Sequence, residues 1–415
     1  MQSRRVAQWA WALSAWANHG FITTVSVGFF PIFFDGYWAS TLPGSTQTFY
    51  LGLTNSTATL IVMFIAPWLG ALADRRAQKK RWLAIWTVIG SAGSAALALV
   101  GPGAWLWALI VYAVCSVSFW AGSSFQDALI VEVADASESN RISSLGFAMG
   151  YIGGGLLFLI NVLMATHPHW FHLDSATTAT RIAFVDVAVW WLLFSLPLFR
   201  SVPEAPPTGE AAGLSQLWAT MRSVMRDRAV RNFLLAYWLY IDAINTVQLM
   251  AVDFGTKLGF SANALITALL MVQFIAFPFA LLFGWLGDRF GTKPAIYLGL
   301  LVFCGVTFYA YFMHSEWQFY LLAGIFGTVQ GGVQALSRSY FARLIPRERA
   351  GEYFGFYNML AKFAAVLGPI AMGIVAIVTG NQRLSILVLE VFFVGGGLLL
   401  ARVDMPGQPG RTADI

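Results

Sequence analysis

The sequence predicts an all-α integral membrane protein with twelve transmembrane helices in two six-helix, pseudo-symmetric bundles. Composition is the first observation, because 58% of the 415 residues are hydrophobic and only 11% are charged, which excludes a set of soluble domains. The second is a series of apolar stretches, each near the length of about 20 residues that a helix needs to cross a bilayer. The third is a polar loop that recurs at the equivalent place in each half of the chain.

The apolar stretches are bounded by charged residues, proline or glycine, and we take each as one crossing. In the first half they cover residues 9–34, 48–72, 82–101, 104–133, 141–165 and 179–200. In the second half they cover residues 230–255, 262–287, 293–313, 317–342, 351–377 and 384–403. An even number of crossings places both chain ends on the same side of the membrane.

Lysine and arginine predict which side that is, because cytoplasmic loops collect them. With both termini cytoplasmic, the inner loops hold most of the basic residues, and the outer loops hold only Arg181, Lys257 and Arg383. The net charge of +5 is spread over short loops and therefore does not indicate binding to nucleic acid. We expect a multi-pass protein of the cell (inner) membrane whose partner is the lipid bilayer.

One long polar segment divides the chain into two parts. Within it, Leu214, Leu217 and Met221 recur at helical spacing opposite Arg222 and Arg226, which predicts a short helix on the inner membrane surface. A disordered basic linker is the alternative. The predicted units are an N-terminal bundle at 1–200, a cytoplasmic linker at 201–228, a C-terminal bundle at 229–405 and a cytoplasmic tail at 406–415.

The two parts also repeat in sequence. GALADRRAQKK at Gly70–Lys80 and GWLGDRFGTK at Gly284–Lys293 each contain a glycine, a spacer, an Asp-Arg pair and further basic residues. Many secondary transporters are built from such duplicated bundles, with the solute site at mid-membrane between them.

These two Gly-x-x-x-Asp-Arg loops resemble the loop signature of the major facilitator superfamily. Four further segments resemble its vacuole-effluxer branch, which contains the autophagy-related amino-acid effluxers of fungal vacuoles and bacterial relatives: WALSAWANHGFITTV from Trp11, YIDAINTV from Tyr240, GGVQALSRSYFARLIP from Gly331 and EYFGFYNMLAKFAAVLGP from Glu352. The resemblance implies the major facilitator fold, alternating access and a small solute such as an amino acid or peptide. The chain departs from the branch at Ser14 and Ala15, where its members carry Tyr-Asp.

Charged residues at the depth of the bilayer centre cost about 3 kcal/mol or more, so each is a candidate for function. Asp242 lies eleven residues beyond Arg231, and Lys362 lies thirteen beyond Arg349, which brings both to similar depths. We expect an ion pair between them in one state of a transport cycle. The alternative is a permanent bridge that only organises the second bundle.

Further candidates for a solute or proton pathway lie on neighbouring helices. The resemblance implies that the helices of Asp127 and Gln126, and of Asn18 and His19, face a central cavity. A structural alternative for Asp127 is a salt bridge with Arg141. Four other polar residues complete the predicted pathway, and they are Arg338, Gln334, Asn245 and Asn358. Arg338 has either a structural role or the role of holding a solute carboxylate.

An inner gate is predicted at the two repeated loops. Asp74 and Arg75 in the first, and Asp288 and Arg289 in the second, lie at helix ends, where carboxylates meet positive helix termini. Such contacts would hold the gate shut and break when it opens. Simple charge topology is the alternative, although it explains the arginines and not the two aspartates.

No motif indicates an enzyme. HExxH, Gly-x-Ser-x-Gly and the phosphate-binding Gly-Lys-Ser/Thr loop are all missing from the sequence, which argues against hydrolysis and against ATP-driven pumping. His167, His169, His172 and Asp174 have a spacing that a metal could use, but scattered histidines in an interfacial loop are far more common. We therefore predict no metal and no other cofactor. Asp186 and Glu390 remain without an assigned role.

Together these features predict a monomeric secondary transporter that works by alternating access, coupled to protons and carrying a small-molecule solute. An exporter of drug-like or lipophilic solutes is the first alternative. A non-transporting membrane receptor or scaffold that kept the fold is the second.

Overall fold

The computed structural model describes residues 2–207, 214–257 and 259–403, and within these ranges the regular elements are all helices. Residues up to 201 form the N-terminal helix group. Its elements are α1 (Gln2–Gly20), the π-helix η1 (Phe21–Phe29), α2 (Phe30–Phe33), the π-helix η2 (Phe34–Trp38), α3 (Gly44–Arg76), α4 (Lys79–Leu97), α5 (Trp105–Ala128), α6 (Ile130–Val133), α7 (Ser139–Thr166), the short 3₁₀ turn η3 (Pro168–Phe171) and α8 (Ala176–Ser201).

Residues from 228 onward form the C-terminal helix group. Its elements are α10 (Arg228–Lys257), α11 (Ala262–Phe290), α12 (Thr292–Ala310), α13 (Glu316–Leu344), the 3₁₀ turn η4 (Arg347–Arg349), α14 (Ala350–Thr379), α15 (Gln382–Ile386) and α16 (Val388–Ala401). Between the two groups lies α9 (Leu214–Arg226).

The predicted all-helical class is confirmed, and each of the twelve predicted segments coincides with one helix or with a run of short ones. Ten stretches of the described chain are long and apolar enough to cross a membrane. The remaining two segments, α4 and α10, are not among these ten, so the count of twelve crossings stays a prediction. The first segment is longer than predicted, since its helix continues through η1 and α2 to Trp38.

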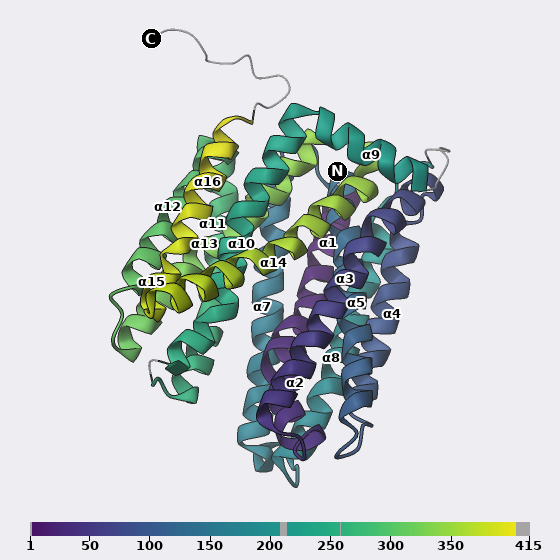
Figure 1. Ribbon diagram of the computed structural model, residues 1–415. Coiled ribbons are helices and arrows are strands. Elements are labelled where there is room, and N and C mark those ends of the chain that lie inside the picture. The colour runs from purple at the N-terminus through teal and green to yellow at the C-terminus, as the bar shows by residue number, and fades with distance from the viewer. Residues whose placement is uncertain (1, 208–213, 258, 404–415) are drawn as a thin grey trace.

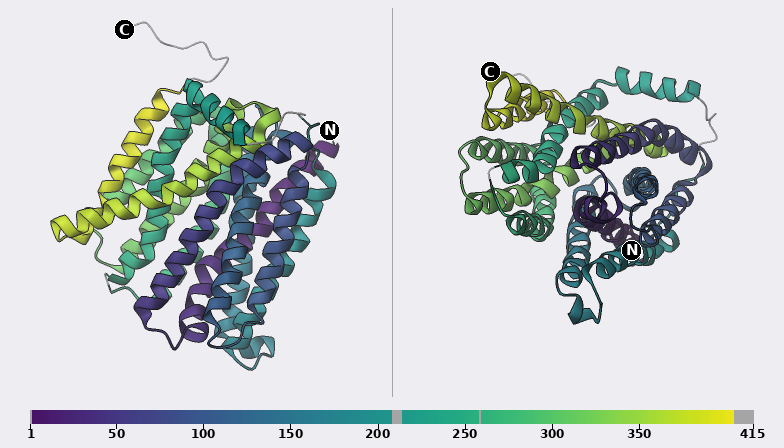
Figure 2. Two further views of the ribbon diagram at one scale, coloured as in Figure 1. Left: turned by 45° about the vertical axis from the view of Figure 1, so that its right-hand side comes forward. Right: turned by 60° about the horizontal axis from the view of Figure 1, so that its bottom comes forward.

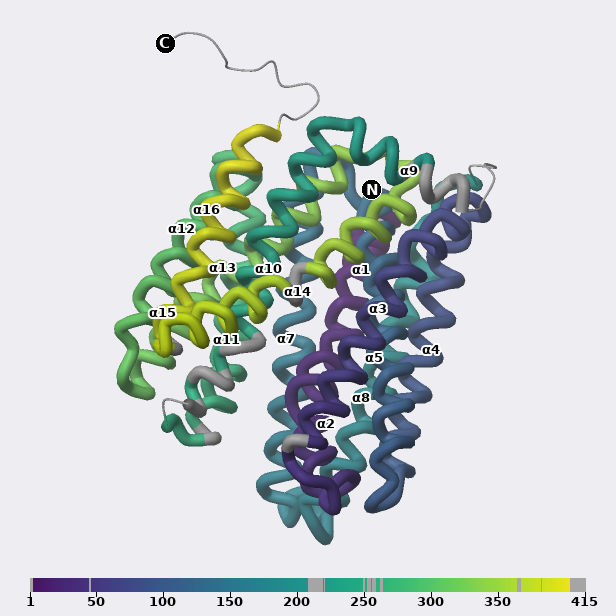
Figure 3. Tube along the Cα trace, in the orientation of Figure 1, coloured from purple at the N-terminus to yellow at the C-terminus, as the bar shows by residue number. Residues whose placement is uncertain are grey.

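The two groups lie side by side, as Figures 1 and 2 show. Helix α1 begins and α16 ends at the same end of the molecule, which we call the terminal end, and α9 lies there too. Between the groups, α7 packs against α11 and α13, while α14 packs against α3 and α5. Figure 3 shows α14 crossing from one group toward the other along its length.

Apolar side chains cover the outside of the helices and polar ones gather within. Ile377, Leu99 and Phe64 are 84%, 82% and 73% exposed, whereas Asp74 and Asp242 are 6% and 0% exposed. Water-soluble proteins show the opposite arrangement, and lipid is the solvent that accepts such a surface. The buried charges therefore lie where only other groups of the protein can satisfy them.

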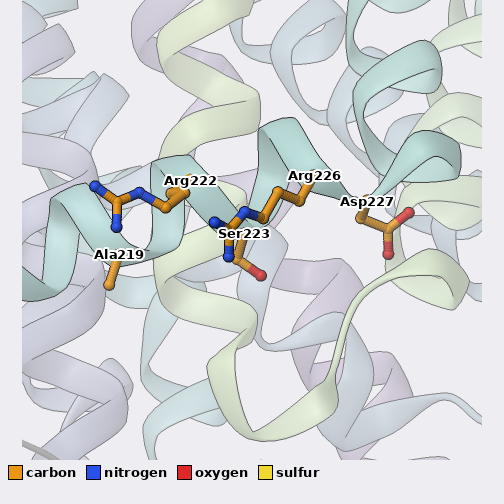
Figure 4. Close-up of a pocket in the computed structure, with 5 residues that line it drawn as sticks. All are labelled: Ala219, Arg222, Ser223, Arg226 and Asp227. Atoms are coloured by element: carbon orange, nitrogen blue, oxygen red, sulfur yellow. The ribbon is translucent and has the colours of Figure 1, made fainter.

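Helix α9 lies within the segment predicted as the linker. Val224 is buried, whereas Met221, Met225, Arg222 and Arg226 are exposed. Its two arginines line a hollow of about 570 Å³ together with Ala219, Ser223 and Asp227, as Figure 4 shows. Parts of the predicted linker, 208–213, and the predicted tail, 406–415, lie outside the described residues.

Candidate functional site

The strongest contact between the two helix groups joins Asp127 of α5 to Arg338 of α13. Nη1 of Arg338 donates to Oδ1 of Asp127 at 2.8 Å, and the two side chains are 7% and 15% exposed. Nε and Nη2 of Arg338 donate to the hydroxyl and the carbonyl oxygen of Ser143 at 2.9 and 2.7 Å. The guanidinium also lies 4.8 Å from the ring centre of Trp11 and 4.4 Å from that of Phe147. This planar cation is thus held on its edges and on its faces.

The alternative partner expected for Asp127 is wrong. Arg141 instead pairs with Glu138 at 3.5 Å, on an exposed surface. The second carboxylate oxygen of Asp127 accepts from Nδ2 of Asn358 at 3.2 Å. Asp127 therefore connects α5 to both α13 and α14, and three of the predicted pathway residues meet at one point.

A second polar chain joins α1 to α5. Nδ2 of Asn18 donates to the side-chain oxygen of Gln126 at 2.5 Å, and Nε1 of Trp11 donates to the backbone oxygen of Gln126 at 2.7 Å. The amide oxygen of Asn18 lies 3.0 Å from Nδ1 of His19. Asn18, His19 and Gln126 are thus neighbours, as the sequence suggested, next to the Asp127 contact.

Asp242 lies on the face of α10 that meets the backbone of α14. Its two carboxylate oxygens accept from the backbone N–H of Gly368 at 3.0 and 3.1 Å, and one accepts from Thr246 at 3.3 Å. A Cβ atom at Gly368 would overlap Oγ1 of Thr246. Only glycine lets the two helices approach closely enough for this contact.

The predicted ion pair between Asp242 and Lys362 is not formed in this conformation. Lys362 instead directs its ammonium group over the ring of Trp120 on α5, across the boundary between the groups. Asp242 lies level with Gly368, which is six residues beyond Lys362 on α14. Those six residues place Gly368 about 9 Å farther along the helix and about 120° around it from Lys362. The predicted match in depth and the predicted shared face were therefore both wrong.

The first repeated loop forms the predicted contact with a helix start. The carboxylate of Asp74 accepts from the backbone N–H groups of Gly351 and Glu352 at 3.1 and 2.8 Å, at the beginning of α14. Lys79 lies 3.1 Å from Asp74 and 3.2 Å from Glu132. A carboxylate at the positive end of a helix is stabilising, so this contact ties α3 to α14 across the groups.

The second repeated loop uses a side chain in place of the backbone. Asp288 accepts from Nδ2 of Asn140 at 3.0 Å, near the start of α7. The amide oxygen of Asn140 accepts from Ser339 at 2.7 Å and from Arg343 at 3.1 Å. Arg75 and Arg289, which we also assigned to the gate, form no ion pair with any described residue.

Two other predicted residues lie beside this network without joining it. Asn245 on α10 and Gln334 on α13 are partly buried, and neither makes a side-chain hydrogen bond within the described part of the chain. Residues that the sequence analysis did not select include Asn140 and Ser143. Their only signal in the sequence is their position near the start of α7.

Contacts between the groups are concentrated toward the terminal end. There Arg347 of the C-terminal group meets Asp135 at 3.3 Å, and Arg4 meets the same carboxylate at 2.6 Å. The Arg4 guanidinium, helped by Arg347, holds the pKa of Asp135 below its usual range. Among the described residues, the hydrogen bond between the groups that lies farthest from the terminal end joins Gln273 to Thr23 at 3.1 Å.

The remaining ionisable candidates lie elsewhere. Glu390 accepts from Thr307 at 2.5 Å within the C-terminal group, and Asp186 makes no hydrogen bond to a described residue. The described residues contain no group of three or more His, Cys, Asp or Glu side chains that could hold a metal ion.

Two helix groups joined by a linker, with Asp74 in the last turn of α3 bound to the start of α14, have the arrangement of the major facilitator fold. Comparison with solved structures agrees with this fold. The human organic anion transporter MFSD10 has the same fold, with a TM-score of 0.77 at 16% identity, covering 96% of this chain and 99% of that one.

The sequence comparisons then identify the family. Residues 44–137 and 130–408 match the family described as vacuole effluxer Atg22 like. A curated relative, the uncharacterized MFS-type transporter YxiO of Bacillus subtilis, is 35% identical over 95% of this chain and 94% of its own. The chain belongs to the Atg22-like vacuole effluxer family, and it is a transporter and not an enzyme.

Fungal members of the family are longer. Autophagy-related protein 22-1 of Aspergillus niger is 28% identical over 64% of this chain and 47% of its own length. The chain thus matches about half of the length of that relative.

Proposed function

We propose that the chain is a proton-coupled secondary transporter that moves a small polar solute, such as an amino acid or peptide, across the cell membrane by alternating access. The observation that carries the proposal is the Asp127–Arg338 pair, a buried ion pair between the two helix groups. Burying two charges is costly, and a pair that only supported the fold could be replaced by apolar residues. A pair that must form in one conformation and break in another has a reason to be charged.

In this proposal the terminal end is the cytoplasmic side, where the sequence concentrates lysine and arginine. The conformation described here is then closed toward the cytoplasm. Four sets of contacts between the groups maintain that closure, at Asp127 with Arg338, at Asp74 with the start of α14, at Asn140 with Asp288, and at Asp135 with Arg347. Opening requires all four to separate as the two six-helix bundles rock about the site.

Proton coupling is assigned to the carboxylates within the membrane. Asp242 is fully buried, and its partners are two neutral donors, the backbone N–H of Gly368 and the hydroxyl of Thr246. A carboxylate without a cationic partner is one that a proton can neutralise at moderate cost. Protonation would weaken both hydrogen bonds from Gly368, and so would loosen α10 from α14.

Reconstituted flux tests this proposal. The full-length protein in proteoliposomes is loaded with a panel of amino acids, short peptides and lipophilic amines, with and without a pH gradient. We expect at least one amino acid or peptide to move, and its flux to rise when a gradient is imposed in one direction. Flux of the lipophilic amines alone would support the alternative of a lipophilic exporter. A solute that raises the melting temperature without any flux would support a receptor, and would overturn the transport proposal.

A further inference from the structure

Lys362 is an ammonium group at membrane depth whose neighbour is an aromatic ring. Its Nζ lies over the indole of Trp120, and no described carboxylate lies within salt-bridge distance of it. The side chain is partly exposed. A charge in this position is expensive unless something compensates it, and an indole face compensates it less well than a carboxylate does.

The surroundings of Lys362 carry an excess of positive charge. Asn358 lies four residues earlier on the same face of α14, and it donates to Asp127, whose other oxygen binds Arg338. Along this line between the groups there are thus two cations, Arg338 and Lys362, and one carboxylate, Asp127. Asp242 does not change the balance, because it binds the backbone on the other face of α14.

The position of Lys362 relative to the closed contacts is also defined. Helices α5 and α14 run in opposite directions, so Asp127 meets Asn358 at one level, and Trp120 meets Lys362 at the next level away from the terminal end. Lys362 therefore lies directly beyond the Asp127–Arg338 pair, on the side from which the contacts between the groups thin out. The proposed transport cycle lets a solute enter from that side, where it would meet the ammonium group before the closed pair.

We propose that Lys362 and Trp120 form the receptor for a carboxylate group of the transported solute. The ammonium of Lys362 turns from the indole to the solute carboxylate, and the freed face of Trp120 packs against the apolar part of the same solute. The substrate class is therefore a carboxylic acid that carries an apolar group, and the bound carboxylate supplies the counter-charge that Lys362 lacks. This inference rests on the proposed transport function and adds to it the residues that hold the carboxylate and the apolar part of the solute.

The experiment compares each acid with its neutral partner. Purified full-length protein is titrated with the twenty standard amino acids and with the corresponding C-terminal amides, and the shift in melting temperature is followed. We expect at least one acid to stabilise the protein in a saturable way, and its amide to bind about 10- to 100-fold more weakly, because one charge-assisted contact is lost. Equal binding of acid and amide, or equal competition by inorganic phosphate, would overturn the inference.

Variants assign the effect to the residue. K362M keeps nearly the length of the side chain and removes the charge. It should therefore weaken binding of the acid by about the same 10- to 100-fold and leave binding of the amide unchanged. K362R should retain part of the affinity, and R383M, which changes a partly exposed cation far from this line, should match the unchanged protein. If K362M does not fold, the affinity of K362R for the acid and the comparison of acid with amide still test the inference.

The two proposals fail separately. If K362M binds and transports the acid as well as the unchanged protein, the carboxylate receptor is wrong and transport stands. If no member of the flux panel moves although acids bind through Lys362, the receptor stands and the transport proposal fails.

Discussion

The side chain of Arg338 makes more contacts than that of any other cation in the described contacts between the groups. Three of its nitrogens donate, to Asp127 and to two oxygens of Ser143, while Trp11 and Phe147 lie near its faces. Lysine could satisfy only part of this set, because its ammonium is a point charge without a planar fork. The sequence could not predict the pair, because its two members are 211 residues apart and either could have found a nearer partner.

Removing Arg338 should open the terminal end. R338Q leaves Asp127 buried without its cation, which costs the closed conformation about 3 kcal/mol, or about 100-fold in the balance between conformations. The rate at which a membrane-impermeant maleimide labels a single cysteine at Ser139 measures this opening, in a background without Cys115 and Cys304. R141Q is the matched control, because an exposed pair contributes little. Equal labelling of R338Q and R141Q would contradict the role of the pair.

The Asp135 contact should not contribute to the pH dependence of transport. Its pKa is held below the usual value of about 4, first by the hydrogen bond from Arg4 and then by Arg347. A lowered pKa means that the contact is fully present above the ordinary pKa and is lost only as pH falls through the lower value. The change in flux between pH 5 and pH 8 should therefore be the same in D135N and in the unchanged protein. A flattened profile in D135N would transfer the coupling role from Asp242 to this loop.

At the scale of elements, α14 takes part in most of the contacts discussed above. It begins at the Asp74 contact, passes Asn358 and Lys362, and reaches Gly368 opposite Asp242. Pro369 follows at once, and since proline has no N–H, the hydrogen bonding of the helix is weakest at this point. One helix thus connects the Asp74 contact, the ammonium group and the buried carboxylate.

Two glycines of α14 offer a matched test of the Asp242 contact. In G368A the new methyl group overlaps Thr246 and lies 3.0 Å from the Asp242 carboxylate, so we expect a loss of about 1–3 kcal/mol in stability and a large loss of flux. In G373A the methyl group meets nothing within 4 Å, and replacing a helical glycine should stabilise the protein by up to about 1 kcal/mol. Melting temperature and flux would be measured for both. Similar behaviour of the two variants would contradict the close approach at Gly368.

Helix existence was predictable from the sequence and helix rotation was not. The length of each apolar run predicted each helix, and the repeated Gly-x-x-x-Asp-Arg loops predicted that Asp74 meets a helix terminus. The Asp242–Lys362 pair was not found, because depth is read from residue counts, whereas the direction of a side chain depends on how each helix turns against its neighbours. Asn140 was missed because an asparagine near a helix start looks like an ordinary helix cap.

At the scale of the whole molecule, the contacts between the groups are unequally distributed. Ser139 and Ser339, Asn140 and Asp288, and Asp135 and Arg347 meet near the terminal end, whereas Gln273 and Thr23 mark the far limit of these hydrogen bonds in the described ranges. An uneven distribution of this kind is expected of a molecule with one closed end, and in the proposed cycle this is the end that separates.

A disulfide across that end should stop transport. The hydroxyl oxygens of Ser139 and Ser339 are 2.9 Å apart, so cysteines at both positions should reach the short sulfur–sulfur distance of about 2 Å after small adjustments. We expect S139C/S339C to lose flux on oxidation and to regain it on reduction, while each single variant is unaffected by oxidant. Flux that survives verified cross-linking would exclude any cycle in which this end opens.

The contact between Asp74 and the start of α14, which acts as a lock between the groups, has two sides that should tolerate substitution to different degrees. One side is the main-chain amide of Glu352, which every amino acid except proline supplies, so most codon changes at position 352 keep the donor. The other side is the Asp74 carboxylate, which a single amino-acid change removes. Substitutions at position 74 should therefore remove the lock itself, whereas those at position 352 should keep it and act only through loss of the buried Glu352–Arg349 pair.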